Sequence, residues 1–397
     1  MNRRRAPRRT SHSQRSEASS NKQWMQINEQ QCQSKDKAHR KEDEEKRHRL
    51  LGKESVPLGT CQTMCPTHEL LDREAKNRLH CFEMLRGTEK DRKPRGDPLR
   101  AVKEYSRPAA GKDLTNPSAL RPPAVLLNTV HYLIDDIATS PGLHPWTEVY
   151  SFVFDRLRGV KQDMIIQRVS GKDCVAILEL TVRFLIYASY RLCGQPLRLY
   201  DPLINDTHLQ ENLSWLLDCY STETGPHPNQ EEFQAIGLLY NLGSHRAAQH
   251  IIELPEQLRS SPSVRLALSI NQAFLETNPV RLLRLAHRLS FLQACALHRH
   301  LPTCCRDLLL IYSHGYSNRN CRFPLGKLAQ LLSLDMKLTA EFCRTFGVDV
   351  NQDDQVFFSK GAFTEPQQKQ MYCHLCHSIV SDKQKDLTLG NIIHGCA

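Results

Sequence analysis

The chain has 397 residues, 40% of them apolar and 24% charged, which is typical of a folded protein with one large domain or two smaller ones. No apolar run approaches the roughly 20 residues that a membrane span needs, and no apolar stretch follows the Arg-rich N-terminus as in a secretory signal. The 15 cysteines follow no disulfide pattern. We therefore expect no membrane partner and a reducing compartment, nuclear or cytosolic, with free thiols.

Residues 1–58 are predicted to be a disordered basic tail. Residues 1–54 hold 15 Lys/Arg and 8 Asp/Glu, so they contribute +7 of the net charge of +10. Their few large apolar side chains cannot offset the entropy of an ordered chain. The runs Arg3–Arg5 and Arg8–Arg9 are typical of a nuclear import signal or a phosphate-binding patch, and a purely solubilising tail explains them equally well.

Residues 59–121 are predicted to form an N-terminal helix followed by an extended strap. A helical pattern begins at Thr67, and one face of it holds apolar residues: Leu71, Ala75, Leu79 and Phe82. The stretch from Gly87 to Arg121 is rich in Pro, Gly, Arg and Lys, and a proline disfavours helix for the residue before it. We expect this stretch to lie over the helical body.

The strap carries two arginines next to prolines, Arg107 and Arg121. The planar guanidinium suits a buried carboxylate, so we expect these side chains to pair with Asp155 or Asp163 of the body. The alternative is that both arginines are simply exposed in a loop.

Residues 122–320 are predicted to be almost wholly helical. Apolar stripes at helical spacing recur along this body, and the stretch from Cys174 to Leu192 is apolar nearly all round, which predicts a central buried helix. Ser244, Ser261 and Asn278 are predicted N-caps, and Gly243 is a predicted left-handed C-cap. Short loops between helices favour antiparallel neighbours, and hence a helical-repeat superhelix.

The pattern changes over residues 321–363. Phe323–Leu332 and Asp335–Phe346 predict two short helices, and two strands are predicted around the turn Asn351–Asp354. This order is typical of a winged helix. The predicted fold class is therefore mainly α: a helical-repeat, PCI-like superhelix that ends in a winged-helix subdomain. Residues 364–397 are polar and predict a loose C-terminal tail with room for one last helix.

Two sets of residues have metal-ligand chemistry. Cys61, Cys65 and His68 lack a fourth ligand, for which His80 or Cys81 are the near candidates, and a structural role is the favoured interpretation. The second set contains a Cys-x-x-Cys pair, which is half of a zinc site: Cys373, His374, Cys376 and His377, with His394 or Cys396 to complete it. We expect neither set to hold a metal and expect no cofactor.

Catalytic motifs are absent from the sequence. It contains no phosphate-binding Gly-rich loop with Gly-Lys-Ser/Thr and no Gly-x-Ser-x-Gly elbow. The adjacent acids Asp135–Asp136 and Glu231–Glu232 diverge by about 100° on a helix, so neither pair is a catalytic carboxylate pair. The prediction is a protein that is not an enzyme and has no small-molecule substrate.

Basic residues at two places are candidate contacts for a partner or for RNA. Arg281, Arg284 and Arg288 lie opposite a leucine-rich face, where they either grip phosphates or are merely solvated. The predicted winged helix contributes the second set: Lys327, Lys337 and Arg344. Between Arg322 and Phe363 five basic residues balance five acidic ones. A domain that binds duplex nucleic acid is clearly basic, so we expect this subdomain to bind mainly a protein.

Several short sequence motifs between residues 59 and 363 resemble those of the Sac-three/GANP family of helical scaffold proteins. They are Gly59–Pro66, Val102–Gly111, Leu120–Pro123, Thr129–Leu133, Asp155–Asp163 and Leu238–Gly243. Two residues depart from the family pattern: at the position of Gly159 the family prefers Ala or Ser, and at that of Lys161 it prefers Arg. The resemblance implies a structural role for the motif residues: Cys61, Cys65, Pro66, Arg107, Pro108, Gly111, Arg121, Pro122, Asp155, Arg156 and Asp163.

The resemblance implies two functions. Long members of the family scaffold the TREX-two complex, which couples transcription to mRNA export, and they carry Phe-Gly repeats before this domain and a centrin-binding helix after it. This sequence has neither, and its length resembles that of a short vertebrate member associated with centrosome duplication, spindle assembly and mitotic progression. We expect a scaffold for centrosomal or spindle proteins, located at the centrosome and spindle and also in the nucleus. The alternative is a nuclear mRNA-export adaptor that binds a PCI-type subunit and RNA.

Overall fold

The structure is a computed structural model that describes residues 56–107, 114–140, 142, 144–223, 225–365 and 378–396. Its contacts divide the chain after Val56, and the unit from Pro57 onward holds the folded body. The predicted tail of residues 1–58 lies almost wholly outside the described residues. The finer predicted boundaries at residues 121, 320 and 363 stay predictions.

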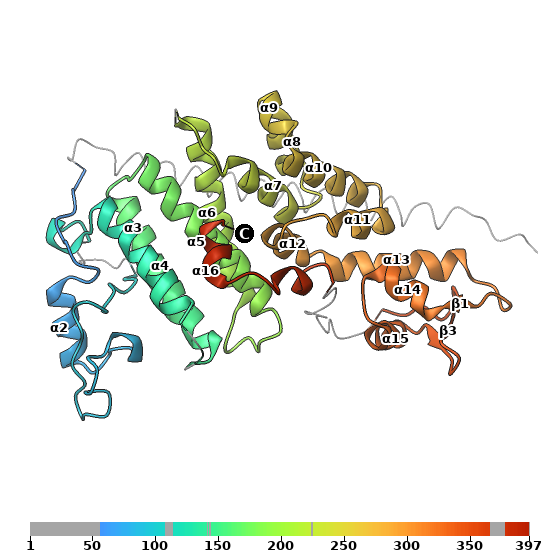
Figure 1. The fold of residues 1–397 in the computed structure, drawn as a ribbon, viewed down its shortest axis with the longest axis horizontal. Coiled ribbons are helices and arrows are strands. Elements are labelled where there is room, and N and C mark those ends of the chain that lie inside the picture. The colour runs from blue at the N-terminus through green and yellow to red at the C-terminus, as the bar shows by residue number, and fades with distance from the viewer. Residues whose placement is uncertain are drawn as a thin grey trace, which may run out of the picture. The chain divides into compact units, whose positions relative to one another are not determined.

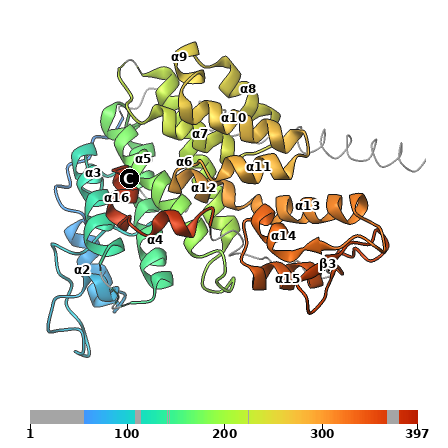
Figure 2. The same ribbon diagram turned by 45° about the vertical axis from the view of Figure 1, so that its right-hand side comes forward.

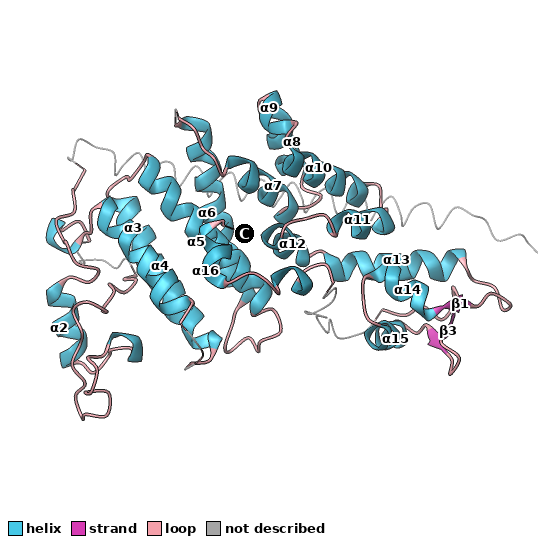
Figure 3. Ribbon diagram, viewed as in Figure 1, coloured by secondary structure: helices cyan, strands magenta, loops and turns pink. Residues whose placement is uncertain are grey.

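Helices dominate the unit from Pro57 onward, as predicted (Figures 1 and 3). Its first half comprises one short helix, two 3₁₀ turns and four longer helical segments: α2 (Thr67–Ala75), η1 (Cys81–Glu83), η2 (Pro117–Ala119), α3 (Pro123–Tyr132) with η3 (Leu133–Ala138), α4 (Trp146–Ile166), α5 (Lys172–Arg191) and α6 (Pro202–Thr222). The second half continues with shorter helices: α7 (Gln230–Tyr240), α8 (His245–Glu253), α9 (Glu256–Arg259), α10 (Pro262–Leu275), α11 (Pro279–Ala286), α12 (Phe291–His298) and α13 (Leu301–Gly315).

Helix α5 is the centre of the hydrophobic core. Of its 20 residues, 15 are buried, as its nearly continuous apolar sequence predicts. It packs against α3, α4, α6 and α12, and α7 then joins α10 and α12 to continue the stack (Figure 2). Successive helices pack as neighbours, which is the arrangement of a helical-repeat superhelix.

The helix boundaries follow local sequence signals. Ser244 and Asn278 occupy the predicted N-cap positions, and each side chain accepts a backbone N–H of its own helix. Ser261 is also an N-cap, although without a side-chain cap bond, and Pro262 opens α10 behind it. Gly243 has φ +80°, which confirms the predicted left-handed residue after α7.

The segment from Phe323 onward is the only part of the described chain that contains strands (Figure 3). Its elements are β1 (Phe323–Pro324), α14 (Leu325–Leu332), α15 (Met336–Thr345), β2 (Asp349–Val350) and β3 (Gln355–Phe357). The three strands pair antiparallel in the order β1-β3-β2. The predicted order of helix, helix and hairpin is present, while the name winged helix stays a prediction for it.

Two sequence predictions are wrong in detail. The predicted apolar face beginning at Thr67 does not form, because α2 ends at Ala75 and Leu71 is 58% exposed, while Leu70 and Arg73 are buried. The prediction of a loose tail fails for residues 378–396, although the last helix that it allowed for is present there. This segment contains η4 (Ser381–Gln384) and α16 (Leu389–His394), and four of its apolar side chains are completely buried: Ile379, Val380, Ile392 and Ile393.

The C-terminal segment returns to the first half of the body. Helix α16 packs against α5 and η3, and Figure 1 shows it, in red, over the green helices. Arg183 of α5 donates from Nη1 to the carbonyl of Ile393 at 3.4 Å. Among the helices that the structure describes, none is long and apolar enough to cross a membrane.

Candidate functional site

A buried carboxylate ties the N-terminal segment to α4. Glu83, at the end of η1, is fully buried and accepts from Arg73 Nη1 of α2 at 2.6 Å and from Arg156 Nη2 of α4 at 3.0 Å. Its other oxygen accepts the backbone N–H of Val102 at 2.9 Å. Burial by itself raises the Glu83 pKa, but the charges of Arg156 and Arg73 outweigh it and hold that pKa below its usual value.

A second buried carboxylate ties the strap to the same helix. Asp163 of α4 accepts from Lys103 Nζ at 2.7 Å and from Arg121 Nε at 2.8 Å, and neither Asp163 nor Arg121 is exposed to solvent. Lys103 also donates to the carbonyl of Ala119 at 2.6 Å, and Arg121 to that of Met64 at 3.2 Å. The predicted pairing of Arg121 with Asp163 is confirmed.

The C-terminal end of α4 also contacts the strap, through two glutamines. Gln167 donates to the carbonyl of Arg121 at 2.8 Å and accepts the backbone N–H of Gly59 at 2.8 Å. Gln162 donates to the carbonyl of Ser106 at 2.7 Å. The strap therefore lies on the surface of α4 that the motif Asp155–Asp163 and the residues after it form.

The other motif residues differ in their surroundings. Cys61, Cys65, Pro66 and Arg156 are buried. Asp155 accepts the backbone N–H of Tyr105 at 3.3 Å, but Arg107 is exposed, so the expected pairing with a body carboxylate does not extend to it. Pro122 is the N-cap of α3. Pro108 and Gly111 lie outside the described residues, as does the Cys373–His377 set.

The first predicted metal set does not converge. Cys61 and Cys65 are buried while His68 is exposed. Cys65 Sγ accepts from Arg73 Nη2 at 3.1 Å, and burial, with a smaller contribution from Glu69, raises the pKa of this thiol to about 12. The structural interpretation of these cysteines is therefore the better one.

The predicted basic contacts are all on the surface. Arg281 and Arg284 lie on the exposed face of α11, Arg288 follows that helix, and Leu282 and Leu283 fill its buried face. Arg281 pairs with Glu276 at 3.1 Å. Lys327 of α14 and Lys337 and Arg344 of α15 are exposed as well. The contact roles of all six stay predictions.

An open groove of about 620 Å³ lies between α10, the turn from α11 to α12 and the C-terminal segment. Its wall includes Glu232, Arg288 and Phe291. Glu232 is already paired with Arg183 at 2.6 Å. The groove therefore contains one carboxylate that is already paired and one exposed arginine. Such a lining suits contact with another molecule better than catalysis.

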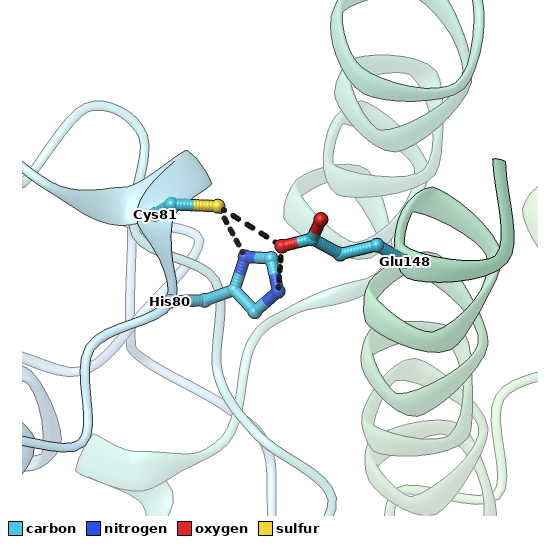
Figure 4. A group of neighbouring side chains, drawn as sticks. All are labelled: His80, Cys81 and Glu148. Atoms are coloured by element: carbon cyan, nitrogen blue, oxygen red, sulfur yellow. Dashed lines mark hydrogen bonds and ion pairs between the residues drawn. The ribbon is translucent and has the colours of Figure 1, made fainter. Parts of the chain in front are cut away.

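Within the residues that the structure describes, two groups of possible metal ligands lie elsewhere. One is His80, Cys81 and Glu148, shown in Figure 4, and the other is His131, Asp135 and His394. Sequence analysis missed both as groups, because each joins residues from distant segments. It also missed Arg73, Glu83 and Lys103. One signal was available: His80 and Glu83 have the spacing of a capping box, which they form at η1.

The fold and these contacts define the class of the protein. A stack of helices is closed by a small mixed unit, and its buried charges hold one chain segment against another. This is a protein of the helical-repeat scaffold class.

Comparison with known proteins identifies the family. The model of the SAC3/GANP family matches residues 64–352, and this chain belongs to the SAC3/GANP family. SAC3 family protein 1 of Schizosaccharomyces pombe is 26% identical over 381 residues, which cover 89% of this chain and 36% of the relative. Protein xmas of Drosophila melanogaster is 28% identical over 340 residues (81% and 16%), and SAC3 family protein B of Arabidopsis thaliana is 25% identical over 299 residues (71% and 17%).

The chain thus spans about a third of the length of the first relative and about a sixth of the other two. Membership in this family supports a scaffold or adaptor role.

Proposed function

We propose that this chain is a non-enzymatic adaptor that docks a protein partner on the surface of α14 and α15. Lys337, Glu341 and Arg344 follow one another at helical spacing along the exposed face of α15, and Met336 beside them is 40% exposed. A face that alternates basic and acidic side chains beside an apolar one suits contact with another protein better than contact with a polyanion. This mixed face is the observation that carries the proposal.

The finer proposal is that this adaptor acts in centrosome duplication, spindle assembly and mitotic progression, at the centrosome and spindle and also in the nucleus. The resemblance to the Sac-three/GANP family supports it. So does the balance of five basic and five acidic residues between Arg322 and Phe363, because it favours protein over nucleic acid at this end of the chain. The partners would be centrosomal or spindle components.

The test is a depletion and rescue experiment in dividing cells with a tagged chain. We expect depletion to change centrosome number and the wild type to restore it. A Lys327→Glu, Lys337→Glu, Arg344→Glu variant should fail to restore it, because reversed charge repels the partner's acidic groups. The matched control reverses Arg246 and Arg265, exposed on α8 and α10, and should rescue. Diffuse signal with normal centrosome number after depletion would refute the finer proposal.

A second candidate is a nuclear mRNA-export adaptor that binds a PCI-type subunit and RNA. The exposed Arg284 and Arg288 favour it, because arginine side chains on a surface neutralise phosphates. Crosslinking to polyadenylated RNA in cells, compared between the wild type and an Arg284→Ala, Arg288→Ala variant, tests it. No crosslink in the wild type and no PCI-type protein in its purified complexes would remove this candidate.

A further inference from the structure

A histidine, a cysteine and a glutamate from two distant segments face one another beside the strap. His80 and Cys81 belong to the turn that begins η1, and Glu148 lies in the first turn of α4 (Figure 4). The rings of Phe82 and Phe152 pack at 5.2 Å from each other, and each lies 4.7 Å from the His80 ring, so they hold the two elements against each other. The three side chains are thus held on rigid elements.

The spacing of their donor atoms is close to that around one zinc ion. Cys81 Sγ is 3.5 Å from Glu148 Oε1 and 3.5 Å from His80 Nδ1, and His80 Nε2 is 3.8 Å from Glu148 Oε1. One ligand atom from each residue lies within 4.8 Å of the other two. Zinc bonds of about 2.0–2.3 Å at tetrahedral angles place ligand atoms roughly 3.3–3.6 Å apart. One ion binds only one imidazole nitrogen, and the two short distances involve different ones, so the His80 ring or the half-exposed Glu148 side chain rotates on binding.

The chemistry of the three donors is that of a zinc site. Thiolate, imidazole and carboxylate are the three side-chain ligand types that zinc accepts. Cys81 Sγ donates to Glu148 Oε1 at 3.5 Å and His80 Nδ1 accepts the backbone N–H of Phe82 at 3.4 Å, so an ion would replace one or both of these hydrogen bonds. All three side chains are partly exposed, which leaves an entry path for an ion.

A fourth group stands next to the site. His144 lies one turn before Glu148, and its Nδ1 is 3.3 Å from Glu148 Oε2. A carboxylate oriented by a neighbouring imidazole is a usual outer contact of a metal ligand.

We propose that His80, Cys81 and Glu148 bind one zinc ion, with the fourth position open to solvent beside His144, and that the ion fastens η1 to the start of α4. The site is independent of the function proposed above.

The other group of possible ligands is a poorer candidate. The rings of His131 and His394 are stacked at 5.4 Å with an angle of 8° between them, so their nitrogen lone pairs, which lie in the ring planes, do not point at one another. Asp135 Oδ1 already forms a hydrogen bond of 2.6 Å with His394 Nε2. This group is a link between α16 and η3.

The test is a titration of the full chain with Co²⁺ and then Zn²⁺, followed by absorbance. The background is a Cys373→Ser, Cys376→Ser variant, which removes the Cys-x-x-Cys pair as a competitor. We expect one Co²⁺ per chain, with tetrahedral d–d bands and a thiolate charge-transfer band, displaced by one Zn²⁺. No such bands in this background would overturn the proposal.

Three further variants assign the ligands. Cys81→Ser should abolish the charge-transfer band, and Cys321→Ser, at another partly exposed cysteine, should leave it unchanged. Glu148→Gln should weaken Zn²⁺ binding at least about tenfold, since even losing an outer contact of a ligand costs that much. Glu148 is a half-exposed side chain, so this variant should keep the wild-type circular dichroism. Wild-type affinity in either Cys81→Ser or Glu148→Gln would refute the site.

Discussion

Asp163 and Arg121 lie 42 residues apart in the sequence and meet in the interior, where Nε donates to Oδ2 at 2.8 Å and neither side chain reaches solvent. Asp163 also accepts from Lys103 at 2.7 Å, so one carboxylate holds two points of the strap. Replacing this carboxylate leaves two cations in the interior without their counter-charge.

Asp163→Asn should therefore lower the free energy of unfolding by about 3–5 kcal/mol, the usual cost of removing one partner of a buried ion pair. Chemical denaturation followed by circular dichroism measures it. The control is Asp72→Asn, which removes the carboxylate that pairs with Lys76 on the surface of α2, and it should leave stability nearly unchanged. Equal effects of the two variants would show that burial of the Asp163 pair does not matter.

Ile393→Ala should destabilise the protein by about 2–5 kcal/mol, because it opens a cavity where α16 packs on α5. Ile393 is completely buried, although it lies four residues from the end of the sequence. Ile252→Ala on α8, where the side chain is 60% exposed, is the matched control and should change stability by less than about 0.5 kcal/mol. A similarly small effect at Ile393 would mean that the C-terminal segment is not part of the core in solution.

Gly347→Ala, between α15 and β2, should destabilise the protein by about 1–2 kcal/mol or more. Gly347 follows α15 with φ +72°, which an L-residue adopts at that cost, and an added Cβ would clash with the carbonyl oxygen of Ala362. Gly326→Ala within α14 meets Met336 Sδ at an ordinary 3.5 Å and should be neutral or slightly stabilising. Thermal melts of the two variants give the comparison, and a neutral Gly347→Ala would contradict this backbone geometry.

Lys383 should make the stability of the folded protein depend on pH in the alkaline range. It donates to the carbonyls of Ala286 and Leu289 at 3.0 and 2.6 Å, and burial lowers its pKa from 10.5 to about 8, against the opposing effect of Cys295. The folded protein thus loses this proton near pH 8, whereas the unfolded chain keeps it up to about pH 10.5. Between these values the unfolded chain binds more protons, so this group's contribution to stability rises with pH.

Lys383→Met lacks this contribution. The free energy of unfolding of the wild type minus that of Lys383→Met should therefore increase from pH 8 to pH 10.5, measured by denaturation at each pH. Groups remote from Lys383 are common to both proteins and cancel in the difference. Of its two neighbours, His287 has a pKa lowered by burial from 6.5, and burial raises the pKa of the Cys295 thiol well above 9.0, so neither titrates in the folded protein across this range. A difference that stays flat or falls across this range would contradict a buried charged amine.

The helices could be predicted from the sequence because their signals are local. Apolar spacing, N-cap residues such as Asn278 and the left-handed Gly243 each act within one or two turns, and they gave the mainly helical fold. The strap was recognised from its prolines, and one of its contacts, Arg121 with Asp163, from the suitability of guanidinium for carboxylate.

Long-range packing could not be predicted in this way. Nothing in the polar stretch around α2 indicates that Arg73 is buried and Leu71 exposed, because the partner Glu83 and the carbonyl of Val102 come from other segments. The tail near Ile393 is polar on average, and only the position of α5 makes its few apolar residues core. The juxtaposition of His80 and Cys81 with Glu148 likewise depends on the docking of η1 on α4.

The contact between Arg183 and Ile393 spans 210 residues of chain. During synthesis on the ribosome, α5 emerges long before the segment that covers one side of it. The central helix therefore stays partly uncovered until residues 378–396 have been synthesised, and exposed apolar surface of this kind is what chaperones bind.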